Sequence, residues 1–452
     1  MTVPHTNDLL LAYYGDDFTG STDALESLAR AGVRTMLFIE PPTPAQLARF
    51  PGLQAIGVAG LTRVMAPDPM EETLRPAFEA LRALGAPHVH YKVCSTFDSS
   101  PLVGSIGRAI QVGEDVFRRA FVPLLIGAPP LGRHCVFGNL FARMGIGSTG
   151  AIYRLDRHPS ASTHPITPMQ ESDLRLHLAK QTTRRIGLFN ILHVELPEAD
   201  ARQVLESLID EGNEIILFDL LYASQLERIG ALLDAHARRS EPLFTVGSSG
   251  VEMALCAHWT STQRLKRVPS WPDPGRARPL LVVCGSCSPV TKRQIEWARA
   301  NGFAEIALDT RALVHSPLET ALEKTLHQAL GALAAGRDVV VHTGGTAQVD
   351  PHIAALGARS AEILGTALGR IVREAAAQVS LKRALFAGGD SSSYAARAVG
   401  IEAVEMLAPL APGAPICRAH APGSPADGLE VNFKGGQVGD SDYFGAVAAG
   451  HL

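Results

Sequence analysis

Short apolar runs alternate with stretches of helical periodicity along the whole chain. The runs in the first half are LLLAYY, QAIGVAG, FVPLLIGAPP, EIILFDL and PLFTVG, and those in the second half are PLLVVCGS, EIALDT, DVVVHTGG and RALFAGGD. Most of them lead into a helical pattern. Strands and helices that alternate in this way form parallel sheets with helices on both faces, so the pattern predicts an α/β fold.

The chain divides at an irregular segment near its middle. The stretch TSTQRLKRVPSWPDPGRARP, residues 260–279, is rich in proline and arginine and has no steady periodicity. A chain of 452 residues is also too long for one ordinary core. We therefore predict two domains, residues 1–262 and 279–452, each with a mainly parallel sheet flanked by helices, joined by a linker at 263–278. A second irregular segment, residues 147–169, predicts a functional or mobile loop.

Composition narrows the range of partners. Hydrophobic residues make up 46% of the chain and charged residues 19%, as in soluble globular proteins, and the net charge of -4 gives no support for nucleic acid or an anionic membrane. No apolar run reaches the ~18 residues of a membrane span, and the first residues lack the basic region of a signal peptide. The six cysteines are few and scattered, which favours reduced thiols in a cytoplasm. Cys284 and Cys287 form a C-x-x-C motif, but no second pair follows at zinc spacing.

The segment YYGDDFTGSTDALESLARAG places Asp16 and Asp17 at the end of the first predicted strand. Asp23 and Glu26 follow in a D-x-x-E pattern, which predicts that the next helix begins at Asp23 or slightly before it. The helix cap then needs neither Asp16 nor Asp17. These two acids either bond turn amides, as aspartate often does, or face a ligand or cation that offsets their mutual repulsion.

A second polar cluster, HYKVCSTFDSSPLVGSIGRA, contains Lys92, Ser95 and Thr96 after a short apolar segment. Arg63 follows another predicted strand in VAGLTRVM. A lysine and an arginine at strand ends suit a carboxylate or a phosphate, since the guanidinium fork matches two oxygens. The alternative is a solvated lysine beside an ordinary helix cap.

The irregular segment 147–169 contributes Arg157 and His158. A histidine in a long polar loop is more often a surface or structural residue than a base, and a role in the site is the alternative. On that alternative, Arg157 and His158 are candidate substrate-binding residues.

Three strand-to-loop transitions in the second half share one composition. CGSCSPVT, HTGGTAQ and AGGDSSSYAAR each place small residues and free amides where a helix can begin, and KGGQVGD follows near the end. Amides at helix starts bind phosphate, and such loops gather at the carboxyl edge of a parallel sheet. We therefore predict a phosphate-binding edge that includes Gly344 of HTGGTAQ. No P-loop motif occurs, and we interpret GIGSTG at residues 145–150 as a chance match to G-x-G-x-x-G, because it follows the helix-like FGNLFARM rather than a strand.

The ordered motifs D-D-F-T-G-S-T-D, K-V-C-S-T-F-D-S-S, G-S-C-S-P-V-T, G-G-D-S-S-S and K-G-G-Q-V-G-D resemble the four-carbon acid sugar kinases over nearly the whole chain. This resemblance implies an amino-terminal domain that holds an acid sugar, a carboxyl-terminal domain that binds ATP, and a reaction in the cleft between them. The K-x-C-S-T-F-D-S form is similar to the branch that acts on 3-oxo-tetronates. Carried over by position, the resemblance implies an acid-sugar site with Asp16, Arg63, Lys92, Ser95 and Thr96, and a nucleotide site with Ser286, Ser288, Gly388, Gly389, Asp390, Ser391 and Gly436.

The resemblance implies an ATP-dependent kinase that phosphorylates the terminal (4-) hydroxyl of a four-carbon acid sugar such as 3-oxo-tetronate, threonate or erythronate. ATP and Mg²⁺ are the expected cofactors, and Asp16 or Asp17 is expected to orient, and to help deprotonate, the attacking hydroxyl. We expect a cytoplasmic protein, compatible with a homodimer, whose partners are small molecules. The alternatives are a nicotinamide-dependent dehydrogenase that uses GIGSTG and a metabolite-binding protein without catalysis.

Overall fold

The computed structural model describes residues 8–146, 150–164, 166–265, 270–286, 288–344 and 359–451. Contacts divide the chain into two compact units, which we call the first and the second unit. The first is formed by Met1–Met36 and Glu40–Pro269, and the second by Leu37–Ile39 and Ser270–Leu452. Each unit is built on a mainly parallel sheet flanked by helices, which confirms the fold class predicted from the sequence.

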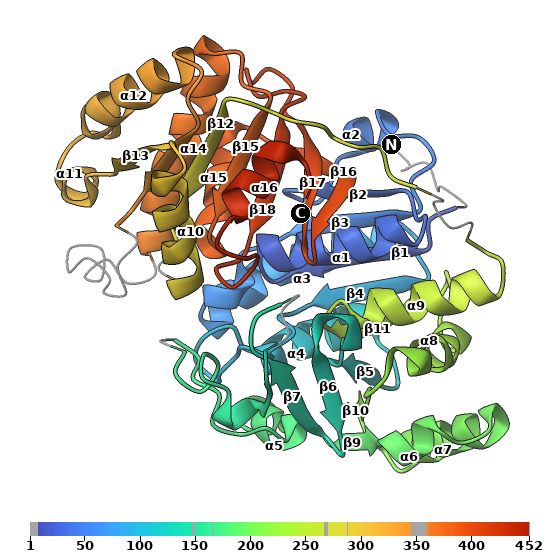
Figure 1. Ribbon diagram of the computed structural model, residues 1–452. Helices are drawn as coiled ribbons and strands as arrows, with labels where there is room; N and C mark the ends of the chain where they lie inside the picture. Colours follow the sequence, from blue (N-terminus) through green and yellow to red (C-terminus); the bar gives the residue numbers. More distant parts are fainter. Residues whose placement is uncertain are drawn as a thin grey trace. The chain divides into compact units, whose positions relative to one another are not determined.

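A parallel sheet with the strand order β3-β1-β4-β11-β5-β10-β9 forms the core of the first unit (Figure 1). Most of these strands are buried along their whole length, which explains why their sequences are continuously apolar rather than alternating. The strands are β1 (Leu11–Gly15), β3 (Ala55–Ala59), β4 (His88–Lys92), β5 (Val122–Leu125), β9 (Ile186–Phe189), β10 (Ile215–Phe218) and β11 (Leu243–Gly247).

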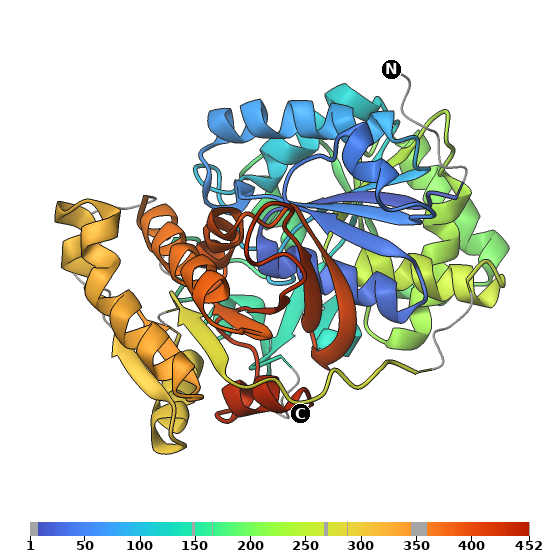
Figure 2. The same ribbon diagram turned by 90° about the horizontal axis from the view of Figure 1, so that it is seen from above.

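Helices cover both faces of this sheet. Helices α1 and α9 pack against each other on one face, and α3 packs on α4 on the opposite face (Figure 2). None of the described helices is both long and apolar enough to cross a membrane. The helices of the first unit are α1 (Phe18–Arg30), α2 (Pro44–Ala48), α3 (Pro67–Ala83), α4 (Ile106–Phe117), α5 (Leu174–Leu178), α6 (Ile191–Val194), α7 (Glu198–Asp210), α8 (Leu226–Ala235) and α9 (Gly250–Ser261).

A small antiparallel sheet, β6-β7-β8, extends the first unit. It contains β6 (Arg133–Val136), β7 (Asn139–Arg143) and β8 (Ile152–Arg154). The prediction that FGNLFARM is helical is therefore wrong. Residues 137 and 138, with φ angles of 48° and 80°, form the two-residue turn that joins β6 to β7, and the side chains of β7 alternate between buried and half-buried positions.

The second unit has the strand order β13-β14-β12-β15-β18-β17-β16. The strands from β13 to β18 in this order are parallel, whereas β17 pairs antiparallel with both β18 and β16. Two residues of β2 (Thr35–Phe38) pair with β16 and belong to this unit. The remaining strands are β12 (Leu280–Cys284), β13 (Ala304–Ala307), β14 (Val339–His342), β15 (Arg383–Ala387), β16 (Ala403–Ala411), β17 (Ala414–His420) and β18 (Glu430–Lys434).

Helices also flank the sheet of the second unit. Helix α14 packs on α12 and α15, and α10 packs on α16, which lies in front of the sheet in Figure 1. These helices are α10 (Pro289–Ala300), α11 (Thr310–His315), α12 (Leu318–Ala334), α14 (Arg359–Gln378), α15 (Asp390–Val399) and α16 (Tyr443–Ala449).

Candidate active site

The carboxyl ends of four neighbouring strands in the first unit lie in register. Gly15 of β1 is opposite Ala59 of β3 and Lys92 of β4, and Lys92 is opposite Gly247 of β11. Past the strand end, the Asp16 N–H donates to the Lys92 carbonyl at 2.8 Å. The residues that follow these strands are thereby held at one edge of the sheet, the place where parallel sheets bind ligands.

Asp16 and Asp17 share one cation, Arg63 from the turn after β3. Arg63 Nη2 lies 2.9 Å from Asp16 Oδ1 and 2.7 Å from Asp17 Oδ1, while Nε and Nη1 donate to the two other carboxylate oxygens at 3.2 and 2.8 Å. Both carboxylates are buried, and the arginine side chain is 19% exposed. A cation does offset the repulsion of the two acids, and that cation comes from this chain.

Asp17 also caps helix α1. Its Oδ1 accepts the N–H of Gly20 at 2.8 Å, and the Thr19 hydroxyl donates to its Oδ2 at 2.7 Å. The helix begins at Phe18, so the predicted start at Asp23 is wrong by more than one turn. The D-x-x-E pattern is misleading here because it lies inside the helix on a buried face.

The environment of Asp16 raises the pKa of this carboxyl. Burial raises the pKa of Asp16, the charge of Asp17 raises it further, and Arg63 acts in the opposite direction. A carboxylate with a raised pKa is a better acceptor for the proton of a sugar hydroxyl than an ordinary surface aspartate.

Lys92 lies buried beside the first turns of α1. Its Nζ donates to the Val93 carbonyl at 3.1 Å and lies 3.8 Å from Asp23 Oδ2. Gly20 lies close to this group of charges, because a Cβ at that position would lie 2.5 Å from Asp17 Oδ1 and 3.1 Å from Lys92 Nζ. Burial raises the pKa of Asp23, and the charge of Lys92 opposes that effect. Asp23 thus belongs to the charged cluster rather than to the helix cap.

Ser95 brings a further cation to this edge. Its Oγ accepts from Arg133 Nε at 3.3 Å, and Arg133 Nη1 donates to the carbonyls of Leu131 and Arg143 at 3.0 and 3.1 Å. Arg133 is buried, burial lowers its pKa, and no carboxylate within the described parts of the chain forms an ion pair with it. The charges of Asp98 and Asp23 act on it without an ion pair. A buried guanidinium whose hydrogen-bond acceptors are all neutral is suited to an anionic ligand.

Thr96 follows in the same turn and is half-buried. Its hydroxyl lies 2.9 Å from the Cys94 sulfur. Burial raises the pKa of Cys94 to about 12, so this thiol is neutral at physiological pH.

The two candidates from the irregular segment differ in their surroundings. Arg157 is exposed, at the end of the 3-10 helix Leu155–Arg157. His158 is buried, and its Nδ1 accepts the N–H groups of Ser160 and Ala161 at 3.2 Å each. Burial, followed by the charge of Arg133, lowers the pKa of His158, so its hydrogen resides on Nε2. That buried nitrogen has no partner in the described part of the chain, which leaves a donor for a ligand.

In the second unit, the loop after β12, which contains Ser286 and Ser288, lies against the loop after β18, which contains Gly436. Ser288 caps α10 by accepting the Val290 N–H at 3.2 Å, as the Ser-Pro pair predicts. Ser286 Oγ accepts the Ser288 N–H at 3.2 Å. A Cβ at Gly436 would lie 3.0 Å from Ser286 Oγ and from Ser288 Cβ, so a larger residue would crowd both serines. Cys287 of the C-x-x-C motif lies outside the described residues.

The loop after β15 joins the same edge. Gly388 has φ 144°, and a Cβ there would lie 2.5 Å from Ser391 Oγ and 3.4 Å from the Ser286 nitrogen. Helix α15 starts immediately afterwards with Asp390 and Ser391 in its first turn, and its N-cap residue, Gly389, has no side chain that could cap it. Uncapped amides at a helix start are suited to phosphate oxygens.

Gly344 follows β14 and has φ 128°. Its N–H donates to His342 Nδ1 at 3.1 Å, so this amide is already engaged. The rest of HTGGTAQ lies outside the described residues. Among the four glycine-containing loops predicted to bind phosphate, the structure brings together those at Ser286, Gly388 and Gly436.

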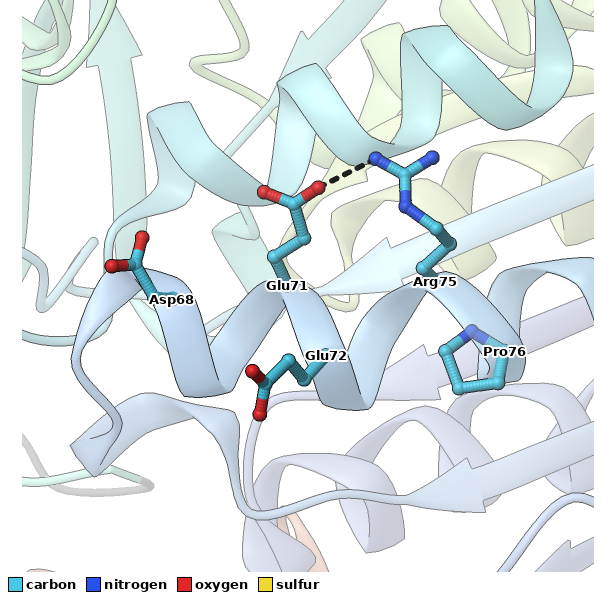
Figure 3. A pocket seen from close by; sticks show the side chains of 5 residues that line it. All are labelled: Asp68, Glu71, Glu72, Arg75 and Pro76. Atoms are coloured by element: carbon cyan, nitrogen blue, oxygen red, sulfur yellow. Dashed lines mark hydrogen bonds and ion pairs between the residues drawn. The ribbon is translucent and has the colours of Figure 1, made fainter.

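A pocket of about 530 Å³ lies apart from these groups, along α3 (Figure 3). It is lined by Asp68, Glu71, Glu72, Arg75 and Pro76, and Arg75 pairs with Glu71 at 2.6 Å. None of the predicted site residues lines it, and Asp115 and Arg108 form further ion pairs with its charged side chains. Within the described ranges, no group of three or more His, Cys, Asp or Glu side chains is arranged to hold a metal ion.

The motif GIGSTG lies between two antiparallel strands. β7 ends at Arg143 and β8 begins at Ile152, and the two strands pair directly. A dinucleotide-binding fingerprint instead connects a parallel strand to a helix. Residues 147–149 of the motif lie outside the described residues. The local fold therefore gives no support to the dehydrogenase alternative.

Comparison with known proteins gives the class of this chain. Residues 11–255 match a sugar-binding N-terminal domain, and residues 281–444 match a nucleotide-binding C-terminal domain. The chain is 45% identical to 3-oxo-isoapionate kinase from Paraburkholderia graminis, over 98% of this chain and 95% of that protein. It is 29% identical to 3-oxo-tetronate kinase from Methylobacterium radiotolerans, over 97% of this chain and 98% of that protein.

A crystal structure from Salmonella typhimurium has the same fold, with a TM-score of 0.73, 24% identity, and coverage of 97% of this chain and 98% of that one. The chain belongs to the four-carbon acid sugar kinase family, as the ordered motifs predict. It is therefore a carbohydrate kinase built from a sugar-binding and a nucleotide-binding domain.

Proposed function

We propose that this protein transfers the γ-phosphoryl group of ATP to the terminal hydroxyl of a 3-oxo acid sugar. The 45% identical relative is named for 3-oxo-isoapionate and the more distant ones for 3-oxo-tetronate, so 3-oxo-isoapionate is the first substrate to test. The geometric observation that carries the proposal is the buried guanidinium of Arg133, which donates to Ser95 Oγ and to main-chain carbonyls and forms no ion pair in the described part of the chain.

The substrate carboxylate is assigned to Arg133 rather than to Arg63. Arg63 already faces two carboxylates, Asp16 and Asp17, whereas Arg133 donates to neutral oxygens. The charges of Asp98 and Asp23 act on Arg133, but neither forms an ion pair with it in the described part of the chain. An anion at Arg133 would therefore gain a direct charged partner, with support from the Lys92 ammonium, the Ser95 hydroxyl and the His158 Nε2 hydrogen. Arg63, which pairs with Asp16 and Asp17 and is partly exposed, is assigned to the incoming phosphoryl group. Thr96 and Arg157 stay candidate contacts of the sugar.

Asp16 is assigned to the attacking hydroxyl, and Asp17 to the support of Asp16. Asp17 is engaged by the start of α1 and by Arg63, which fixes its orientation. The pKa of Asp16 is raised by burial, so it is the better base of the two for a hydroxyl proton. Because a carboxylate is a weak base for an alcohol, orientation of the hydroxyl is its main contribution.

The nucleotide phosphates are assigned to the amides and hydroxyls at Ser286, Ser288, Gly388 and Gly436. Close glycine packing and the uncapped start of α15 favour phosphate binding at this edge. Mg²⁺ bound to the phosphates of ATP would supply charge neutralisation for the transfer. The location of the reaction in a cleft between the domains stays a prediction.

An ADP-release assay over several acid sugars tests the proposal. We expect the highest kcat/KM with 3-oxo-isoapionate, lower values with 3-oxo-tetronate, and the lowest with threonate and erythronate. Release of ADP with none of the four acids, from protein shown to be folded, would contradict the proposal. Binding of an acid without ADP release would favour the non-catalytic alternative.

The cytoplasmic location and the homodimer are proposals of the same kind. ATP as the phosphoryl donor supports a cytoplasmic reaction. Cell fractionation tests the location, and sedimentation equilibrium of the full chain tests the oligomeric state.

A further inference from the structure

Lys434, the last residue of β18, is completely buried in the second unit. A buried ammonium is costly unless hydrogen bonds and an opposite charge compensate it. Its Nζ donates to Thr291 Oγ1 at 3.1 Å, and no carboxylate in the described part of the unit pairs with it. Lys434 is the first residue of the motif KGGQVGD, in which the sequence predicts a nucleotide-binding role for Gly436 only.

Thr291 connects Lys434 to Ser286 in the loop after β12 by hydrogen bonds. Its hydroxyl donates to Ser286 Oγ at 3.1 Å, with the Gly436 carbonyl as a second acceptor at 3.3 Å. Ser286 Oγ accepts in addition from the Ser288 N–H at 3.2 Å. Two donors thus fill the lone pairs of Ser286 Oγ, and its own hydrogen has no acceptor among the described residues.

We propose that Lys434 is a positioning residue for the nucleotide, which acts through Thr291 and directs the Ser286 hydroxyl hydrogen toward a phosphate oxygen. The inference rests on the proposed nucleotide site. The negative charge of the phosphates, three hydrogen bonds away through Thr291 and Ser286, compensates the buried ammonium. Nucleotide binding is therefore linked to the charge of Lys434.

The surroundings of Lys434 make this charge adjustable. Burial lowers the pKa of Lys434 to about 8. The Cys284 thiol of β12 is the one titratable group in the described chain whose charge acts on it. β15 contributes the neutral Ala387 in register with Lys434, and α10 contributes the neutral hydroxyl of Thr291.

The direction of the pH effect follows from these surroundings. Bound phosphate favours the ammonium, so the pKa of Lys434 is higher in the complex than in the free protein. Affinity is greatest below pH 8, where Lys434 is already charged, and falls as the pH rises through 8 toward the pKa of the complex. A rise of one pKa unit on binding corresponds to about tenfold in affinity.

Calorimetry of ADP binding tests the inference on the unmodified protein. ADP is titrated into the full chain at pH 8.5, without acid sugar, in two buffers that differ in ionisation enthalpy. The phosphates of ADP are fully ionised at this pH, so a proton that is taken up binds to the protein. We expect uptake of about half a proton per ADP and a dissociation constant about tenfold weaker at pH 9.5 than at pH 7.

Variants identify the group that takes up the proton. Lys434→Met should abolish the uptake and hold the affinity for ADP, at every pH, near the weak value of the wild type at pH 9.5. Thr291→Val should weaken ADP binding, and Thr291→Ser should restore it. Lys382→Met, which removes a half-exposed lysine just before β15, is the matched control and should leave affinity and uptake unchanged.

The outcomes separate this inference from the proposed function. ADP binding with no proton uptake and no dependence on pH overturns the inference alone, because a purely structural lysine gives that result. Absence of ADP binding at every pH overturns the nucleotide site itself. If Lys434→Met does not fold, the wild type without proton uptake still overturns the inference, and Thr291→Val, which breaks the link between Lys434 and Ser286, must lower both the affinity and the uptake.

Discussion

Replacement of Arg133 by methionine removes the cation to which we assign the substrate carboxylate. Arg133 donates through Nε to Ser95 at 3.3 Å and through Nη1 to two main-chain carbonyls. Methionine keeps much of the buried volume and removes the charge. We expect the loss to appear mainly in the KM for the acid sugar, because the carboxylate is not the reacting group.

The expected size follows from the contacts that are lost. A hydrogen bond to a charged group contributes about 1.5–3 kcal/mol, so one such bond to a carboxylate corresponds to about 10- to 150-fold in kcat/KM. Arg133→Lys keeps the charge without the fork and should lose less. The KM for ATP should change less than threefold, since ATP is assigned to the other unit.

Steady-state ADP release with varied acid sugar measures this effect. Arg143→Met is the matched control, because Arg143 lies on the neighbouring strand and its side chain donates to the Gly150 carbonyl. Circular dichroism and thermal unfolding establish that the variants are folded. If Arg133→Met keeps a KM for the acid sugar within threefold of the wild type, the carboxylate does not bind at Arg133.

Three further substitutions or conditions test other parts of the site and fold. Asp16→Asn should lower kcat by orders of magnitude and leave ADP affinity nearly unchanged in calorimetry; activity within threefold would refute the role of Asp16. Asp17→Ala should lower the free energy of unfolding by at least about 2 kcal/mol in urea titrations, since it removes a helix cap and a partner of Arg63, whereas Asp17→Asn keeps a capping oxygen and should cost less. Burial lowers the pKa of His88, and hydrogen bonds from His88 and Trp259 outweigh burial to lower the pKa of Asp234, so both groups bind fewer protons in the folded state than in the unfolded one. The stabilisation from both groups is therefore fully present near pH 7 and is lost in two stages, as the pH falls below 6.5 and again below 3.8. Asp234→Asn should flatten the second decrease of the unfolding temperature in thermal scans.

The α/β architecture was predictable because parallel strands that are buried on both faces have continuously apolar sequences. The start of helix α1 at Phe18 was not predictable in the same way. The D-x-x-E pattern at Asp23 fits the same local rule as the true cap at Asp17, which accepts the Gly20 N–H. What distinguishes the two positions is tertiary, since Asp17 pairs with Arg63, which is 46 residues away in the sequence. A local pattern carries no information on a partner at that distance.

The hairpin that presents Arg133 was missed for a different reason. FGNLFARM satisfies a helical period, and the signal for a hairpin is the single glycine at 138 between alternating residues. Without the hairpin, nothing in the sequence links Arg133 to Ser95. Lys434 was visible in its motif, but its role depends on burial and on a contact with Thr291, which is 143 residues away.

The central claim is that this protein moves a phosphoryl group from ATP to an acid sugar. Incubation with 3-oxo-isoapionate and ATP labelled in its γ-phosphoryl group, followed by separation of the products, tests it most directly. We predict that the label appears in a phosphorylated acid sugar, and that its appearance requires both the acid and Asp16. Label that remains in ATP, or that appears as inorganic phosphate alone, would contradict the account.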